Sequence, residues 1–179
     1  MRFLISAAGT GGHVFPALEF SAECIKNNHD VLWMGTKTGL ESRKVPEKNI
    51  QFLTIPMRGF RGKGLLNKCI SIFGLIASIG KTIIFLFQYK INFVVCFGGY
   101  ISLPVGIAAI LCRKQLILHE QNAVMGTSNK LLAPFAKIIF LGTPLAILPQ
   151  KNTQLVGNPI KKINKLQDTV PPKSDELKI

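Results

Sequence analysis

Apolar and polar residues form alternating blocks along this chain, and these blocks predict strands and helices in turn. Short, continuous apolar runs predict buried strands at 3–8, 30–35, 51–55, 92–97, 115–119, 137–141 and 153–156. Segments with helical spacing lie between them, at 14–28, 40–48, 65–88, 101–112 and 127–136. Strands that are apolar along their whole length are typical of a parallel sheet between two helical layers. The pattern therefore predicts an α/β fold with a doubly wound, mostly parallel, Rossmann-like sheet.

This pattern ends near residue 160. Residues 161–179 are polar and rich in lysine and contain Pro171 and Pro172, so we expect a linker or a disordered tail there. Residues 1–160 are enough for one domain with a substantial core, whereas all 179 residues are too few for two full-sized α/β domains.

Three of the predicted strands run into unusual loops, at 8–13, 97–104 and 119–127. Ligands of doubly wound sheets bind outside the carboxyl ends of the strands, where such loops meet. We therefore expect the three loops to converge in space and to form the functional site.

The first loop reads Gly9-Thr10-Gly11-Gly12-His13 between a strand and a helix. Glycines let the backbone approach an anion closely, and a helix N-terminus carries partial positive charge, so this segment predicts a phosphate site. His13 adds a titratable ring and is the better catalytic candidate among the histidines. A nicotinamide site is disfavoured, because Val14 stands where the fingerprint needs a glycine and the second strand ends at Gly35 instead of an acid.

The other two loops add groups that suit a phosphorylated sugar. The segment Gly98-Gly99-Tyr100-Ile101-Ser102 offers a second helix N-terminus to an anion. The segment His119-Glu120-Gln121-Asn122 places a carboxylate and two amides at the rim of the sheet, which makes Glu120 a second candidate base. A strand-end turn held by its own side chains explains this last segment equally well. Zinc is disfavoured, because Ala123 stands where the H-E-x-x-H motif needs histidine.

The segment 65–88 is unusually apolar, and Lys81 is the one charged residue between Cys69 and Tyr89. A membrane-spanning helix would place Lys81 inside the bilayer at a cost of about 2.5–3.5 kcal/mol. We therefore expect a helix with one face on the sheet and the other on a bilayer surface, and an unusually apolar core helix is the alternative. The expected membrane surface consists of Arg58, Arg61, Lys63, Lys68, Ile72, Phe73 and Ile76.

The net charge of +13 suits an anionic membrane surface or a diphosphate ligand. Nucleic acid is disfavoured as a partner, because no aromatic residues are interleaved with the basic runs. The four cysteines are widely spaced, which predicts buried and reduced thiols. The apolar run at the N-terminus is too short for a signal peptide, so no export is expected.

Five motifs in this order resemble the N-terminal half of the MurG family of N-acetylglucosaminyltransferases. They lie at 9–17, 58–64, 97–102, 119–123 with 127–130, and 157–159. The resemblance implies a two-domain GT-B glycosyltransferase without a required metal or other cofactor. This half would bind lipid I, an undecaprenyl-diphospho-muramoyl-pentapeptide, as a peripheral protein at the cytoplasmic face of the inner membrane, against anionic lipid. The reaction would transfer GlcNAc from UDP-GlcNAc, with inversion, to the C4 hydroxyl of the muramoyl sugar, which gives lipid II for peptidoglycan.

The resemblance also implies residue roles. The candidate bases are His13 and Glu120. The implied contacts to UDP-GlcNAc come from Thr10, Gly11, Gly12, Asn122 and Lys161, and those to the acceptor diphosphate and sugar come from Gly9, Gly98, Gly99, Tyr100 and Ser102. The family usually has arginine where Lys161 stands, and lysine lacks the two-pronged guanidinium fork.

Family members are about twice as long as this chain, and their donor-binding C-terminal domain has no counterpart in it. The chain is then either a fragment or one half of a split enzyme with a separate donor-binding partner. A non-catalytic membrane module that binds the lipid-linked acceptor is the second functional hypothesis.

Overall fold

The computed structural model describes residues 1–57, 65–146 and 152–160 and, for 65–71, the course of the backbone alone. The strands are β1 (Arg2–Ser6), β2 (Asp30–Gly35), β3 (Gln51–Thr54), β4 (Phe93–Cys96), β5 (Gln115–Glu120), β6 (Ile138–Leu141) and β7 (Thr153–Leu155). The helices are α1 (Gly11–Lys26), α2 (Leu40–Lys44), α3 (Leu65–Gln88), α4 (Ser102–Leu111) and α5 (Thr127–Leu132), with single 3-10 turns η1 (Pro46–Lys48) and η2 (Ala133–Phe135). Every predicted strand and helix is present, with ends that differ by a few residues. The predicted tail at 161–179 lies outside the described residues.

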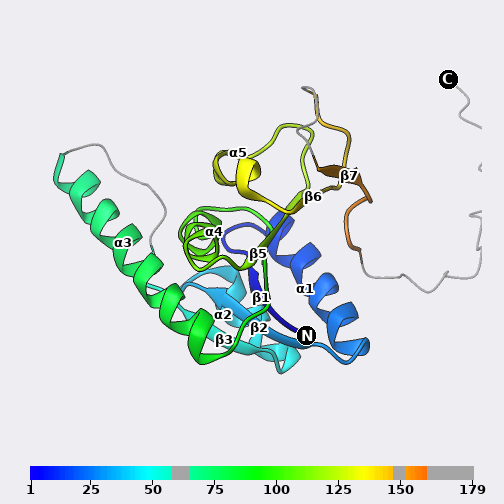
Figure 1. Cartoon of the computed structure of the whole chain (residues 1–179), viewed down its shortest axis with the longest axis horizontal. Helices are drawn as coiled ribbons and strands as arrows, with labels where there is room; N and C mark the ends of the chain where they lie inside the picture. The colour runs from blue at the N-terminus through cyan, green and yellow to red at the C-terminus, as the bar shows by residue number, and fades with distance from the viewer. Residues whose placement is uncertain (58–64, 147–151, 161–179) are drawn as a thin grey trace, which may run out of the picture.

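All seven strands are parallel and follow the order β3-β2-β1-β4-β5-β6-β7 (Figure 1). The chain moves outward from β1 to β3 and then returns to β4 on the other side of β1. This reversal makes the carboxyl ends of β1 and β4 the switch point of the sheet, where doubly wound folds bind their ligands. The predicted doubly wound α/β fold is confirmed.

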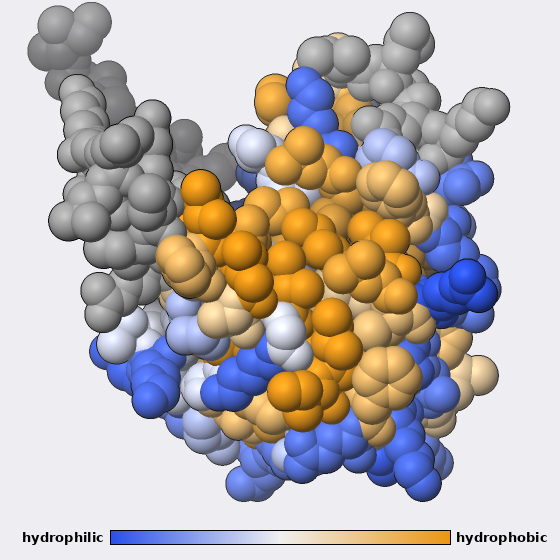
Figure 2. Space-filling view, turned by 60° about the vertical axis from the view of Figure 1, so that its left-hand side comes forward, coloured by the Kyte–Doolittle hydropathy of each residue, from blue (hydrophilic) through white to orange (hydrophobic). Residues whose placement is uncertain are grey.

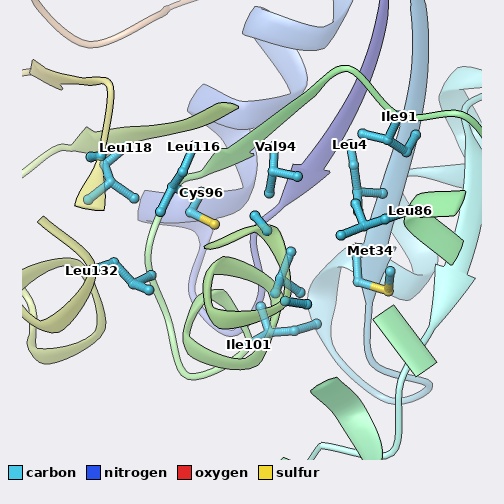
Figure 3. Packing of buried hydrophobic residues seen from close by; sticks show 14 of the residues in the cluster. Leu4, Met34, Leu86, Ile91, Val94, Cys96, Ile101, Leu116, Leu118 and Leu132 are labelled. Carbon is cyan, nitrogen blue, oxygen red and sulfur yellow. The ribbon is translucent and has the colours of Figure 1, made fainter. Parts of the chain in front are cut away.

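Neighbouring residues of each strand face opposite helical layers, as the pleat of a strand requires. Leu4 and Val94 pack beneath α3, α4 and α5, whereas Ile5 and Val95 pack beneath α1 and α2. Figure 3 shows the first of these layers, in which Leu86 of α3, Ile101 beside α4 and Leu132 of α5 meet the sheet. Burying each such side chain contributes about 1.5–3 kcal/mol.

The long helix α3 packs on the sheet with one face. Leu86 is fully buried, whereas Ile72, Phe73 and Ile76 are 54%, 76% and 61% exposed. The alternative of an unusually apolar core helix is therefore wrong for these three residues. Within the described ranges, we find no helix that combines the length and the apolar character of a membrane crossing.

The cysteines follow the prediction in part. Cys24 and Cys96 are buried, and Cys112 is half-buried, while the side chain of Cys69 lies outside the described residues. Burial raises the pKa of the Cys96 thiol to about 12 and, with a contribution from Glu23, that of Cys24 to about 11. These two thiols therefore stay protonated and unreactive near neutral pH.

The one-sided packing of α3 predicts opposite behaviour of two residues on the same helix. Leu86→Ala leaves a cavity in the core and should lower the free energy of unfolding by about 2–5 kcal/mol. Ile84→Ala, at a position that is 62% exposed, should change it by less than about 0.5 kcal/mol. Urea denaturation measures both, and equal losses would show that the two faces of α3 are wrongly assigned.

Candidate functional site

The three loops predicted to converge do line one cavity, of about 550 Å³. It lies at the carboxyl ends of β1, β4 and β5, which are neighbours in the sheet. The cavity is lined by His13, Gly98, Gly99, Tyr100, Leu103, Glu120, Asn122, Gly126, Thr127, Ser128, Asn129 and Leu131. Its size falls within the range typical of small-molecule sites.

The structure distributes the sequence-predicted residues unevenly around this cavity. The two candidate bases and most of the second loop line it. Thr10 and Gly12 are exposed, Gly11 is half-buried, and neither these three nor Gly9 is among the lining residues. Lys161, Arg58, Arg61 and Lys63 lie outside the described residues, as does the side chain of Lys68.

The first loop rests on a buried carboxylate that the sequence analysis missed. Glu41 of α2 is fully buried and accepts hydrogen bonds from the backbone N–H of Gly9, at 3.3 Å, and of Thr36, at 3.1 Å. The Thr36 hydroxyl donates to the same carboxylate at 2.7 Å, so the Tyr100 hydroxyl, 3.4 Å away, acts as donor to Thr36. Glu41 thereby ties the first glycine loop to the second. The N–H of Gly9 donates to Glu41 and is therefore not free to bind a diphosphate. The contact predicted for Gly9 would have to come from other N–H groups of the loop.

The second loop packs directly against the first, and glycine makes this approach feasible. Gly99 has a φ of +78°, and a Cβ there would lie 2.5 Å from the carbonyl oxygen of Ala8. A Cβ on Gly98, where φ is +97°, would lie 3.0 Å from Cε1 of His13. Any other residue would push these loops apart, because both positive φ and the short contact exclude a side chain.

The hydroxyl of Ser102 holds the backbone of the second loop. This hydroxyl accepts the N–H of Gly98 at 3.1 Å and donates to the Gly98 carbonyl at 2.7 Å. Ser102 is fully buried and does not line the cavity. The structure therefore places it beneath the loop, as a support for the backbone, and we expect it to shape the predicted acceptor site without touching the acceptor.

Glu120 organises the third loop. The residue is 1% exposed, and one carboxylate oxygen accepts the backbone and side-chain N–H groups of Asn122, both at 3.1 Å. The other oxygen accepts the N–H of Gly126 and the side-chain N–H of Asn129, both at 3.0 Å. Asn129 belongs to the 127–130 motif, and its role here was not predicted. Four donors on one carboxylate hold the loop in shape.

His13 is half-buried and contacts the third loop. Its Nδ1 lies 2.9 Å from Oε1 of Gln121, and the side-chain nitrogen of Gln121 lies 3.2 Å from Nδ1 of His119. His119 is buried, stacks on Phe97 with ring centroids 5.1 Å apart, and places Nε2 3.3 Å from the carbonyl oxygen of Gly157. Burial lowers the pKa of His119. The hydrogen bond to the Gly157 carbonyl and the charge of Glu120 partly oppose this shift.

Over the part of the chain that the structure describes, no three histidine, cysteine or acidic side chains come close enough together to hold a metal ion.

Comparison with known proteins identifies the domain. Residues 3–141 match the N-terminal domain of glycosyltransferase family 28. The chain belongs to glycosyltransferase family 28. The resemblance to the MurG family is also confirmed, because several relatives that share 38–43% of their residues with this chain carry the name of the MurG enzyme.

Two curated relatives illustrate the similarity. Each is named UDP-N-acetylglucosamine--N-acetylmuramyl-(pentapeptide) pyrophosphoryl-undecaprenol N-acetylglucosamine transferase. The protein of Idiomarina loihiensis is 41% identical over 162 residues, which cover 90% of this chain and 45% of the relative. That of Acidithiobacillus ferrooxidans is 43% identical over 159 residues, which cover 89% and 44%.

Solved structures agree with the sequence relatives. The crystal structure of MurG from Acinetobacter baumannii superposes with a TM-score of 0.78 and 34% identity, over 90% of this chain and 46% of that one. The Streptomyces glycosyltransferase SsfS6, at 14% identity and a TM-score of 0.61, shares the fold. The chain spans just under half the length of its family 28 relatives.

The hydrogen bonds of Glu120 predict that removing its charge destabilises the fold. Glu120→Gln keeps the shape but turns an NH₂ group toward N–H donors, so it should lower the free energy of unfolding by about 1–3 kcal/mol. Glu47→Gln, at an exposed residue paired with Lys44, should change it by less than about 0.5 kcal/mol. Urea denaturation of both variants is the measurement, and similar values would contradict the assigned role of Glu120.

Proposed function

We propose that this chain is the acceptor-binding half of an inverting N-acetylglucosaminyltransferase, which transfers GlcNAc from UDP-GlcNAc to lipid I and so forms lipid II. The observation that carries the proposal is the cavity at the switch point of a family 28 domain, with His13 and the Gly98–Gly99 loop in its wall. The names of the relatives at about 40% identity support the same donor and acceptor.

In the proposed reaction, the C4 hydroxyl oxygen of the muramoyl sugar forms a bond to C1 of GlcNAc. The bond from C1 to the UDP oxygen breaks, and UDP leaves with that electron pair. A base must take the hydroxyl proton, and His13 suits this role. It lines the cavity, its Nδ1 is hydrogen-bonded to Gln121, and its Nε2 faces away from Gln121. Glu120 uses both carboxylate oxygens to hold its loop, so we assign it to positioning.

The remaining contacts divide between the two substrates. Thr10, Gly12 and Asn122 are exposed, and Asn122 lines the cavity, so a donor bound mainly by a second domain could reach them. Thr10 is the N-cap residue of α1, and its side chain makes no capping hydrogen bond, so the first N–H groups of this 16-residue helix suit a phosphate. Gly99 and Tyr100, in the cavity wall, are the proposed contacts of the acceptor diphosphate and sugar.

The exposed side of α3 gives the proposed membrane contact. We call Ile72, Phe73, Ile76, Ile84 and Phe87 the apolar face; each is more than half exposed. Figure 2 shows a broad apolar area on this side of the molecule, where α3 packs beside α4. An apolar helix face in a chain of net charge +13 suits the surface of an anionic inner membrane, which supports peripheral attachment at its cytoplasmic side.

The membrane contact is tested by replacing Ile72, Phe73 and Ile76 together with serine. Loss of these exposed apolar groups should weaken binding to phosphatidylglycerol vesicles at least tenfold, an effect of about 1.4 kcal/mol or more. The control carries serine at Ile25, Leu155 and Ile160, which are also exposed but lie on other elements. Sedimentation with vesicles measures binding. Equal binding of the two folded variants would show that α3 does not meet the membrane.

The catalytic proposal is tested with the chain joined to the C-terminal half of the Acinetobacter baumannii MurG. This joined protein should transfer labelled GlcNAc to lipid I. His13→Ala should lower the rate by about 10²- to 10⁴-fold, because a general base contributes about that much. His29→Ala, in a turn at the opposite end of the sheet, is the matched control and should be neutral. A joined protein whose activity survives His13→Ala would refute the role of His13 as base.

A further inference from the structure

A continuous chain of side-chain contacts leads from His13 to the segment that follows β7. His13 contacts Gln121, Gln121 contacts His119, and His119 contacts the carbonyl oxygen of Gly157, at 2.9, 3.2 and 3.3 Å. The first and last of these residues are 144 positions apart in the sequence (157 − 13). His119 and Gln121 are buried, so water does not substitute freely for these partners.

The contact between His119 and the Gly157 carbonyl determines where the protons lie in this series of side-chain contacts. A carbonyl oxygen only accepts, so Nε2 of His119 carries the proton that points at Gly157. Burial lowers the pKa of His119 and favours the neutral ring, which carries a single proton. Nδ1 of His119 is then an acceptor and receives the side-chain N–H of Gln121.

The orientation of Gln121 follows, and so does the state of His13. Because the amide nitrogen of Gln121 faces His119, its oxygen faces Nδ1 of His13 and accepts a hydrogen bond from the N–H there. The neutral ring of His13 therefore carries its proton on Nδ1 and a lone pair on Nε2. With Gln121 reversed, its amide oxygen would require a proton on Nδ1 of His119, and a neutral His119 would then turn a lone pair toward the Gly157 carbonyl.

We propose that Gln121 and His119 are positioning residues, which use the Gly157 carbonyl to hold His13 in the tautomer whose Nε2 can take a proton. The inference rests on the proposed function, in which His13 is the base. It adds two residues to that function and links the base to the backbone that follows β7.

The Gly157 turn is built to keep its carbonyl in place. The N–H groups of Val156 and Gly157 donate to Leu141 at the end of β6, at 3.0 and 3.1 Å, and Gly157 has a φ of +82°. The side chain of Asn158 packs on Gly142 so closely that a Cβ there would overlap it, and it reaches the Gln121 carbonyl at 3.5 Å. The turn is thus anchored to the end of β6 and, through Asn158, to Gln121 at the end of the neighbouring strand β5.

The test is the tautomeric state of the histidines, read from long-range ¹H–¹⁵N NMR spectra of the whole 179-residue chain. The chain has three histidines, so single substitutions assign them, and His29 serves as an internal reference outside the contact chain. At about pH 8, above the ordinary imidazole pKa, the expected result is a proton on Nε2 of His119 and on Nδ1 of His13. A proton on Nε2 of His13 in the unaltered chain would overturn the proposal without any variant.

Two variants test whether the contacts cause this state. Gln121→Leu removes the acceptor of the His13 proton, and His119→Phe keeps the stack on Phe97 but removes the acceptor of the Gln121 proton. In both, His13 should lose the pure Nδ1–H signature and show a mixture of tautomers. An unchanged signature in folded Gln121→Leu would overturn the role of Gln121, and in folded His119→Phe that of His119.

The spectra also separate this inference from the proposed function. The tautomers are read without substrate and without a donor domain. If the expected spectra appear while His13→Ala leaves transfer intact in the joined protein, the positioning chain stands and the assignment of the base fails. If transfer depends on His13 while its proton sits on Nε2, the base stands and the positioning chain fails.

Discussion

The contact between the ends of β1 and β4 is the constraint on which the site depends. These central strands run side by side, and their following loops must pack against each other before any ligand can bind. The approach of Gly99 to the Ala8 carbonyl leaves no room for a Cβ, so the shape of the cavity depends on the absence of side chains at two glycines. His13 gains its place in the wall through the same close approach.

Two buried carboxylates keep these loops in shape. Glu41 lies beneath the first loop and Glu120 within the third, and each accepts several N–H groups of nearby backbone and side chains. A buried carboxylate is stable when such donors satisfy it, and it then holds their chain segments at fixed distances. The two carboxylates stabilise the loops, and His13 lines the cavity that these loops form.

The proposed acceptor would use two neighbouring regions of one helical layer. Leu103 of α4 and Leu131 of α5 line the cavity, and α4 packs against both α3 and α5. The apolar face of α3 therefore belongs to the layer that borders the cavity. A lipid-linked diphosphate sugar would suit such a neighbourhood, because its prenyl chain would stay in the bilayer while its sugar reached the loops around the cavity.

The sequence by itself determined the elements, the parallel doubly wound sheet and the three loops that meet at its edge. These follow from local patterns, because continuous apolar runs, helical spacing and glycines report on burial and backbone shape within a few residues. The tertiary structure decided which polar groups meet. Glu41 finds Gly9 across 32 positions and Gln121 finds His13 across 108, and no local pattern records such pairs. Glu120 illustrates the difference: its sequence context suits a base equally well, and only the donors that folding brings around its carboxylate assign it to holding the loop.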